Sequence, residues 1–203
     1  MDDDDGWLAT HEAGHSVVAT LWPGWTLRGV TISGGTYSAG CARVVPPLIP
    51  AADCAMVDFG APFDTWPLAV RTFCEARYAI SAAGTLAELM LTPRGTRRPL
   101  TVARDVPDLA ADLPPLEPDD AAALIAVVNS DGDDDLTTIA KVSRFAFGTD
   151  LDARNAWAGH METLTEGLIL ANREAIERLA AVLGQLRSMS GEAAAAVIRD
   201  TQP

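Results

Sequence analysis

The sequence predicts a mostly helical α+β domain with a small β-hairpin or sheet beside its first helix. Alanine and leucine dominate the apolar residues, which favours helices over strands. Hydrophobic residues make up 48% of the chain, enough to bury a core, which argues against a disordered protein. Two short β-like runs follow the first helical segment. A length of 203 residues fits a single domain spanning the whole chain, residues 1–203.

The first helix is predicted over residues 6–21. Asp4 and Asp5 precede it, where they can cap its amino end and complement its dipole. The Pro23-Gly24 pair ends it.

A hairpin is predicted next, with strands over residues 27–32 and 40–45 and a glycine-containing turn at 33–36. Three prolines between positions 46 and 50 then forbid regular structure.

The rest of the chain is expected to be helical apart from one long excursion. The excursion covers residues 92–119 and is rich in Pro, Arg and Asp. An acidic turn at 130–135 is expected to open one of the helices. The remaining helices are predicted over residues 63–91, 119–128, 135–147, 152–186 and 191–200.

The charge of the chain counts against a nucleic-acid partner. Its formal net charge of −13 and pI near 4.4 leave no basic face for phosphates. We interpret this acidity as a solvated surface, and no local feature supports the alternative of binding basic peptides or polyamines.

Soluble, cytoplasmic character is expected. The Met-Asp-Asp-Asp-Asp opening is unlike a signal peptide, and no apolar run reaches the roughly 18 residues that span a bilayer. Cys41, Cys54 and Cys74 are odd in number and form no C-x-x-C pair, so buried thiols in a reducing compartment are expected.

Chemistry is concentrated in the first helix, where His11, Glu12 and His15 form an H-E-x-x-H motif. Histidines four residues apart project to the same side of a helix, so both imidazoles can bind one zinc ion. Glu12 lies beside them and can act as general base toward a metal-activated water. The alternative is an amphipathic helix whose histidines are solvated or satisfied in the core. Gly14 argues against it, because a glycine inside a helix indicates close approach of another group.

The string A-T-H-E-A-G-H-S-V-V-A, residues 9–19, resembles the peptidase domain of the FtsH family of ATP-dependent zinc metalloproteases. The hairpin is similar to the strand pair whose edge binds substrate peptide in that family. The segments A-A-G-T-L-A-E, G-D-D-D-L-T-T-I-A-K-V-S-R and A-N-R-E-A-I-E-R-L-A are similar to its later helices, in the same order.

The resemblance implies a zinc peptidase in which Asp135 is the third ligand, and it aligns Arg144 with a frequent arginine of the family. The chain departs from the family in lacking a G-x-x-x-x-G-K-[ST] loop and a transmembrane segment. It therefore looks like a stand-alone peptidase domain without the ATPase module. The excursion is also longer than the family's pattern suggests.

The residues themselves leave the third metal ligand open. Asp135 could instead cap a helix, and Asp133 and Asp134 compete with it. Asp119 and Asp120 open another predicted helix and could also serve.

Glu88 stands on a nearly apolar helix, where a carboxylate needs a partner. We expect it to orient a histidine ligand; binding the metal or pairing with an arginine are the alternatives. His160, the remaining histidine, is expected at the surface or an interface.

Three functions are compatible with these features. The first is an ATP-independent zinc metallopeptidase acting on unfolded or flexible peptides. The chain could form a homo-oligomer, and the sequence does not decide its oligomeric state. The second is a metal-binding regulatory or interaction module without peptidase activity. The third is a different metal-assisted hydrolase using the same motif. Glu12 favours the first function, because a metal-binding module without peptidase activity has little need for a general base.

Overall fold

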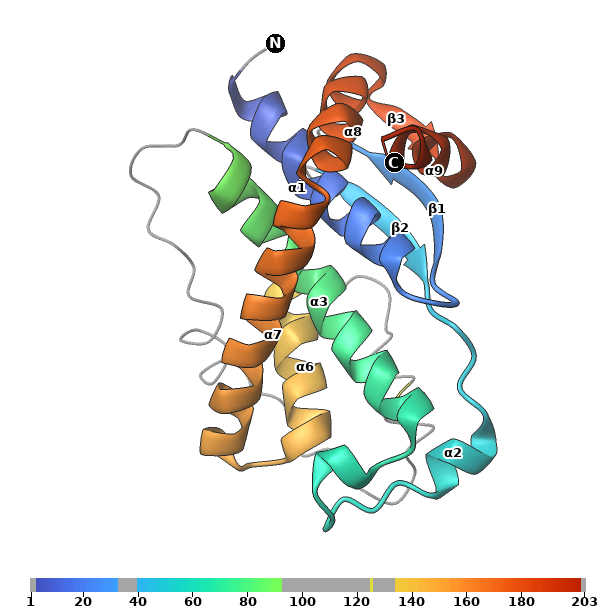
Figure 1. The fold of residues 1–203 in the computed structure, drawn as a ribbon, viewed down its shortest axis with the longest axis vertical. Coiled ribbons are helices and arrows are strands. Elements are labelled where there is room, and N and C mark those ends of the chain that lie inside the picture. Colours follow the sequence, from blue (N-terminus) through green and yellow to red (C-terminus); the bar gives the residue numbers. More distant parts are fainter. Residues whose placement is uncertain (1–2, 33–39, 93–124, 126–133, 202–203) are drawn as a thin grey trace. The chain divides into compact units, whose positions relative to one another are not determined.

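The computed structural model describes residues 3–32, 40–92, 125 and 134–201. They form a mostly helical protein with a small antiparallel sheet, as predicted (Figure 1). The chain divides into two compact units. The first comprises residues 1–47, 83–99 and 164–203, and the second comprises residues 48–82 and 100–163.

The first unit begins with α1 (Asp3–Leu21). Asp4 and Asp5 therefore lie inside its first turn, and the prediction that they precede and cap the helix is wrong. Acidic residues are favourable at that end of a helix dipole, which is compatible with the earlier start. The helix ends before Pro23, as predicted, and Gly24 turns the chain with a φ of 81°.

The predicted hairpin is confirmed, as β1 (Thr26–Thr31) and β2 (Cys41–Val45) pair antiparallel. Its turn lies outside the described residues. A third strand that the sequence did not predict, β3 (Ser188–Ser190), pairs with the other side of β1, giving the order β2-β1-β3. Arg187 precedes β3 with a φ of 64°, a left-handed conformation that ends the preceding helix and turns the chain into the strand.

Helices cover this sheet. The α1 helix contacts β1, β2 and α8 (Arg173–Leu186), and α9 (Gly191–Arg199) contacts β1 and α8 (Figure 1). A Cβ at Gly191 would overlap the carbonyl of Leu27, so glycine lets α9 begin directly against β1. Apolar side chains from these helices fill the core, which includes Val17, Val18, Ile176, Leu179, Leu183 and Ile198.

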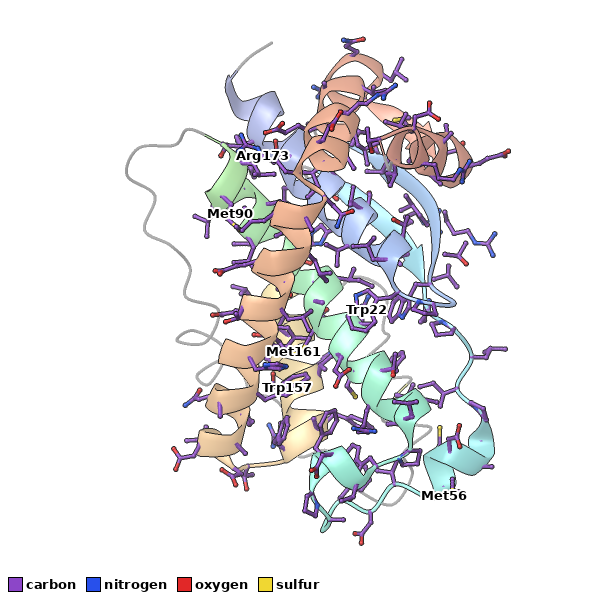
Figure 2. All side chains as sticks on the ribbon, in the orientation of Figure 1. Trp22, Met56, Met90, Trp157, Met161 and Arg173 are labelled. Carbon is purple, nitrogen blue, oxygen red and sulfur yellow. The ribbon has the colours of Figure 1, made fainter. Side chains whose placement is uncertain are left out.

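The second unit contains α2 (Ala51–Ala55), the 3-10 helix η1 (Phe63–Thr65) and α6 (Asp135–Phe147). The first part of α3 (Leu68–Leu91) and of α7 (Leu151–Ala171) completes it. Seven aromatic residues form its ring cluster, namely Phe59, Phe63, Trp66, Tyr78, Phe145, Phe147 and Trp157. Trp157 and the fully buried Met161 project from α7 (Figure 2).

Two predicted helices are interrupted. The helix expected over 63–91 is η1 followed by α3, because Trp66 precedes a proline and is extended, with a ψ of 159°. The helix expected over 152–186 is α7 and α8, separated at Asn172. The backbone of Asn172 is not helical, with a φ of −116° and a ψ of 22°, and its side chain donates a hydrogen bond to the Leu168 carbonyl at 2.9 Å.

Of the two short helices predicted over 191–200 and 119–128, the structure describes only the first. The helix of the carboxyl-terminal segment is confirmed as α9. The excursion at 92–119 and the helix expected over 119–128 lie outside the described residues, apart from Thr92 and the helical Ile125.

Candidate metal centre

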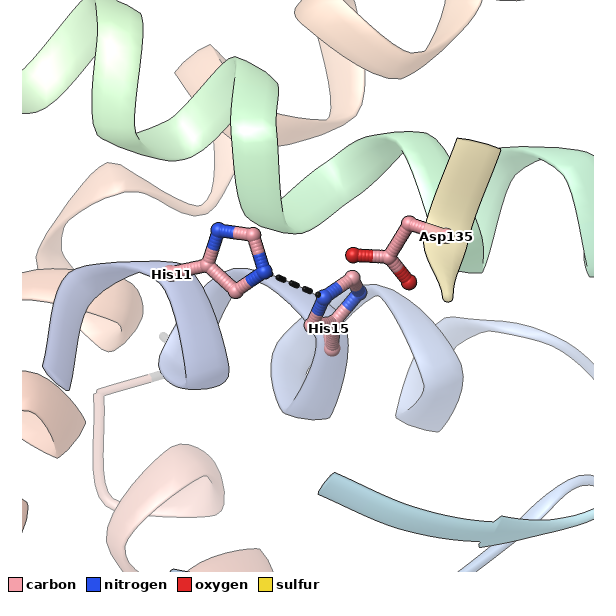
Figure 3. Close-up of side chains that lie close together, drawn as sticks. All are labelled: His11, His15 and Asp135. Atoms are coloured by element: carbon pink, nitrogen blue, oxygen red, sulfur yellow. Dashed lines mark hydrogen bonds between the residues drawn. The ribbon is translucent and has the colours of Figure 1, made fainter. Parts of the chain in front are cut away.

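The α1 helix brings the two motif histidines together. The Nε2 atoms of His11 and His15 lie 3.0 Å apart, and their rings meet edge to face with centroids 4.7 Å apart (Figure 3). His15 is buried and His11 is half-buried. Two nitrogens this close can share one metal ion at about 2.0–2.1 Å each. Without a metal, the same distance allows one ring N–H to donate to the other ring.

Gly84 on α3 makes room for both imidazoles. A Cβ at this position would collide with Nε2 of His15 and would lie 2.7 Å from Nε2 of His11. Gly84 belongs to the segment A-A-G-T-L-A-E, which resembles a helix of the FtsH family, but that resemblance predicts no role for it. A glycine inside an apolar helix, at a cost of about 1 kcal/mol relative to alanine, was the available signal.

Gly14 produces the close approach that the sequence predicted. A Cβ there would lie 2.6 Å from the Ala83 carbonyl oxygen and 2.7 Å from the Ala87 Cβ. This glycine therefore lets α1 approach the last turns of α3 and brings His11 and His15 against Gly84.

Glu12 is buried, with 4% of its surface exposed. It lies against Gly40, where a Cβ would come within 2.5 Å of its Oε1 atom. Gly40 immediately precedes β2, so the carboxylate lies at the start of an edge strand of the sheet. Sequence reasoning missed this role, although a glycine at a strand often marks close approach of another group.

Glu88, on α3, faces the other side of His11. Its Oε2 atom lies 3.6 Å from Nδ1, the ring nitrogen of His11 that does not face His15. The distance exceeds that of a hydrogen bond but allows electrostatic attraction, which strengthens when the ring carries positive charge. The geometry thus puts Glu88 beside the ring that it was expected to orient.

Asp135 is the first residue of α6 and joins the histidines in one group. The ligand atoms of His11, His15 and Asp135 all lie within 4.8 Å of one another (Figure 3). Two imidazoles and a carboxylate form a possible metal-binding triad. Among the described residues, no other group of three His, Cys, Asp or Glu side chains meets this criterion.

The residues considered as alternative metal ligands are not part of this group of three. Asp134 caps α6, because its Oδ1 accepts the Thr137 backbone N–H at 2.8 Å. Asp133, Asp119 and Asp120 lie outside the described residues. His160 is exposed on α7.

The cysteines take no part in this triad. Cys54 and Cys74 are buried as expected, whereas Cys41 is exposed, so the expectation of three buried thiols is wrong for that residue. Cys41 is the first residue of the edge strand β2, in which alternate side chains face outward. Burial raises the pKa of the Cys74 thiol well above its ordinary value, which disfavours the metal-binding thiolate.

No family model and no curated protein matches this chain. Among the described helices, none is long and apolar enough to cross a membrane.

Proposed function

We propose that this chain is a zinc metallopeptidase that hydrolyses unfolded or flexible polypeptides without ATP. The observation that carries the proposal is the pair of imidazole Nε2 atoms 3.0 Å apart, with the buried Glu12 on the same helix. The FtsH-like pattern of the sequence gives the same interpretation.

The residues present fit a catalytic zinc ion. His11, His15 and Asp135 supply two nitrogens and an oxygen, and three protein ligands leave a position for water or substrate. Gly84 supports the same assignment, because a side chain at this position would collide with both Nε2 atoms and prevent them from lying together here. When bound, zinc would lower the pKa of water to about 7 and polarise the scissile carbonyl.

Glu12 supplies the acid–base chemistry in this proposal. Its carboxylate accepts a proton from the attacking water and later donates that proton to the leaving amine. Glu88 orients the His11 ring from the opposite side, which makes it a positioning residue.

The edge of the sheet offers a place for the substrate. In the order β2-β1-β3, β2 is an edge strand, and no second strand of the described residues pairs with it. An extended peptide can add to such an edge through main-chain hydrogen bonds. Gly40 brings the start of β2 against Glu12, so a peptide on this edge would run close to the general base. Chains that are already unfolded can adopt this geometry without an ATP-driven unfoldase.

Cleavage of casein, an unfolded protein, tests the proposal. Zinc-loaded protein should cleave casein, and Glu12→Gln should lower the rate by about 10²- to 10⁴-fold while zinc content stays unchanged. Glu166→Gln, an exposed glutamate on α7, is the matched control and should cleave normally. Failure of the zinc-loaded protein to cleave any unfolded substrate would favour the metal-binding module instead.

A further inference from the structure

The small sheet carries positive charge in a chain that is acidic overall. The whole sequence contains 28 Asp and Glu residues against 15 Lys and Arg residues, and its formal net charge is −13. Among the described strands β1, β2 and β3, by contrast, the charged residues are two arginines, Arg28 and Arg43. Both residues are exposed. An acidic ligand is therefore repelled by the chain as a whole but attracted to these strands.

Arg43 lies in the middle of β2, on the face that points away from α1. Exposed and half-buried residues alternate along this strand, and Arg43 belongs to the exposed set. Gly40, whose Cβ would meet Glu12 of α1, is three positions earlier and so belongs to the opposite face. Ala42 and Val44, the half-buried neighbours of Arg43, also belong to that face. The edge of β2 thus presents a cation on one face and apolar residues on the other.

On the inner side of β2, no side chain pairs with Arg43. Its cross-strand partner on β1 is Gly29, which has no side chain, and in the described part of the chain no acidic group forms an ion pair with Arg43. On the outer side is the edge of the sheet, because β2 pairs with no second described strand. A strand added there would place one side chain opposite Arg43, with Cβ atoms about 4.5–5.5 Å apart. An opposite charge at that position is favourable, and a like charge is unfavourable.

We propose that Arg43 makes the edge of β2 selective for extended polypeptide segments in which an acidic side chain lies between apolar neighbours. This selectivity rests on the proposed function, in which an unfolded substrate adds to the edge. The acidic side chain would pair with Arg43, and its neighbours would point to the other face, beside the apolar residues of β2. Because Gly40 and Glu12 meet at the start of the strand, the acidic residue would lie about three residues, or roughly 10 Å, from the bond that is cleaved.

Three peptides that differ at one central residue test this selectivity. Each is an acetylated and amidated casein segment of about ten residues in which all charged side chains are replaced by glutamine, and the central residue is Glu, Gln or Lys. Fluorescence anisotropy measures their binding to the zinc-loaded full chain carrying Glu12→Gln, which keeps the peptides intact. Affinity should fall in the order Glu, Gln, Lys, by about two- to fivefold at each step. The net charge of the chain alone predicts the reverse order, so equal affinities or the reverse order would overturn the proposal.

Charge reversal at Arg43 identifies the residue responsible. In the same Glu12→Gln background, Arg43→Gln should abolish the preference for the Glu peptide, and Arg43→Glu should reverse the order. Arg28→Glu, which makes the same change in net charge, is the matched control. Arg28 lies on the middle strand, so an added strand would be two strand spacings away, or roughly 9–10 Å, and the order should be unchanged. An unaltered order in Arg43→Glu would contradict the proposal.

Cleavage by the wild type separates this proposal from the peptidase proposal. If the wild type cleaves casein, mass spectrometry of the products should show acidic residues enriched about three residues from the cleaved bonds, relative to the rest of casein. The Arg43→Glu variant should lose this enrichment. Selective peptide binding without any cleavage would support the selectivity of Arg43 and contradict the peptidase, and cleavage without acidic enrichment would do the reverse. Binding of no peptide at all would overturn the proposal and leave Arg43 as a charge that prevents pairing between copies of this chain.

Discussion

Three glycines set the space around the histidine pair. Gly84 faces the imidazoles, Gly14 faces the backbone of α3, and Gly40 faces the Glu12 carboxylate. At each position a methyl group would meet an atom of its neighbour at 2.7 Å or less. Because interiors are close-packed, such contacts force the neighbours to move. The arrangement of the histidines and Glu12 therefore depends on the lack of a side chain at these three glycines.

Gly84→Ala should disturb zinc binding more than folding. The added methyl group displaces both imidazoles, so we expect zinc affinity to fall at least about tenfold, because a site displaced by a fraction of an ångström loses ligand geometry. Competition with a chromophoric chelator measures the affinity, and circular dichroism checks that the helices remain. Gly159→Ala is the control, since no atom lies within 4 Å of its Cβ. Normal zinc affinity in Gly84→Ala would show that the rings need no such space.

Glu88→Gln should weaken the metal site without removing a ligand. The substitution preserves shape but removes the charge 3.6 Å from Nδ1 of His11, so zinc affinity should fall about 10- to 100-fold. The same chelator competition measures the change. Glu177→Gln, which removes an exposed carboxylate paired with Arg173, should have no effect. If both variants bind zinc like the wild type, Glu88 does not support the histidine.

The sequence identified the residues that carry the proposed chemistry but missed those that shape their surroundings. His11, Glu12 and His15 could be found from spacing alone, because the helix itself fixes their relation. The roles of Gly40 and Gly84 depend on segments that lie far along the chain from α1. No local pattern specifies which side chain such a glycine will face.

At the level of elements, the start of α6 separates two adjacent aspartates. Asp134 precedes the helix and caps it through Thr137, whereas Asp135 is the first helical residue and joins the histidine group. The sequence could not distinguish capping from metal binding in this acidic turn, because aspartate is suited to both roles. A shift of one position along the chain separates the capping aspartate from the one that lies beside the histidines.

Substitution of each aspartate should separate the two roles. Asp134→Ala should lower the free energy of unfolding by about 1 kcal/mol through loss of the cap, with zinc affinity unchanged. Asp135→Ala should lower zinc affinity by more than Glu88→Gln does, with little loss of metal-free stability. Urea unfolding in a chelator and zinc titration measure the two quantities. Stronger zinc loss in Asp134→Ala would reverse the assignment.

The elements missed by the sequence have physical reasons. A tertiary pairing with β1 creates β3, which spans three residues and is too short for an alternating pattern. The α7–α8 break occurs at one asparagine inside a continuous amphipathic pattern. In contrast, the hairpin and α1 follow from local signals, namely glycine turns and helical spacing, that tertiary contacts reinforce.

At the scale of the whole molecule, metal binding and stability should be coupled. A metal that binds the folded chain alone stabilises it by about 2.7 kcal/mol at a free concentration of 100 times Kd. Loss of the metal would therefore affect both activity and folding. The net charge of −13 also favours accumulation of cations near the protein, an attraction that salt weakens.

Zinc content per chain tests the metal site most directly. Equilibrium dialysis of the full chain against buffered Zn²⁺, followed by elemental analysis, should give one zinc ion per chain for the wild type. The double substitution His11→Ala and His15→Ala should give none under the same conditions, with the control variant Glu166→Gln still binding one. A wild-type protein without bound zinc, or a double variant that retains it, would contradict the assignment of His11 and His15 as metal ligands.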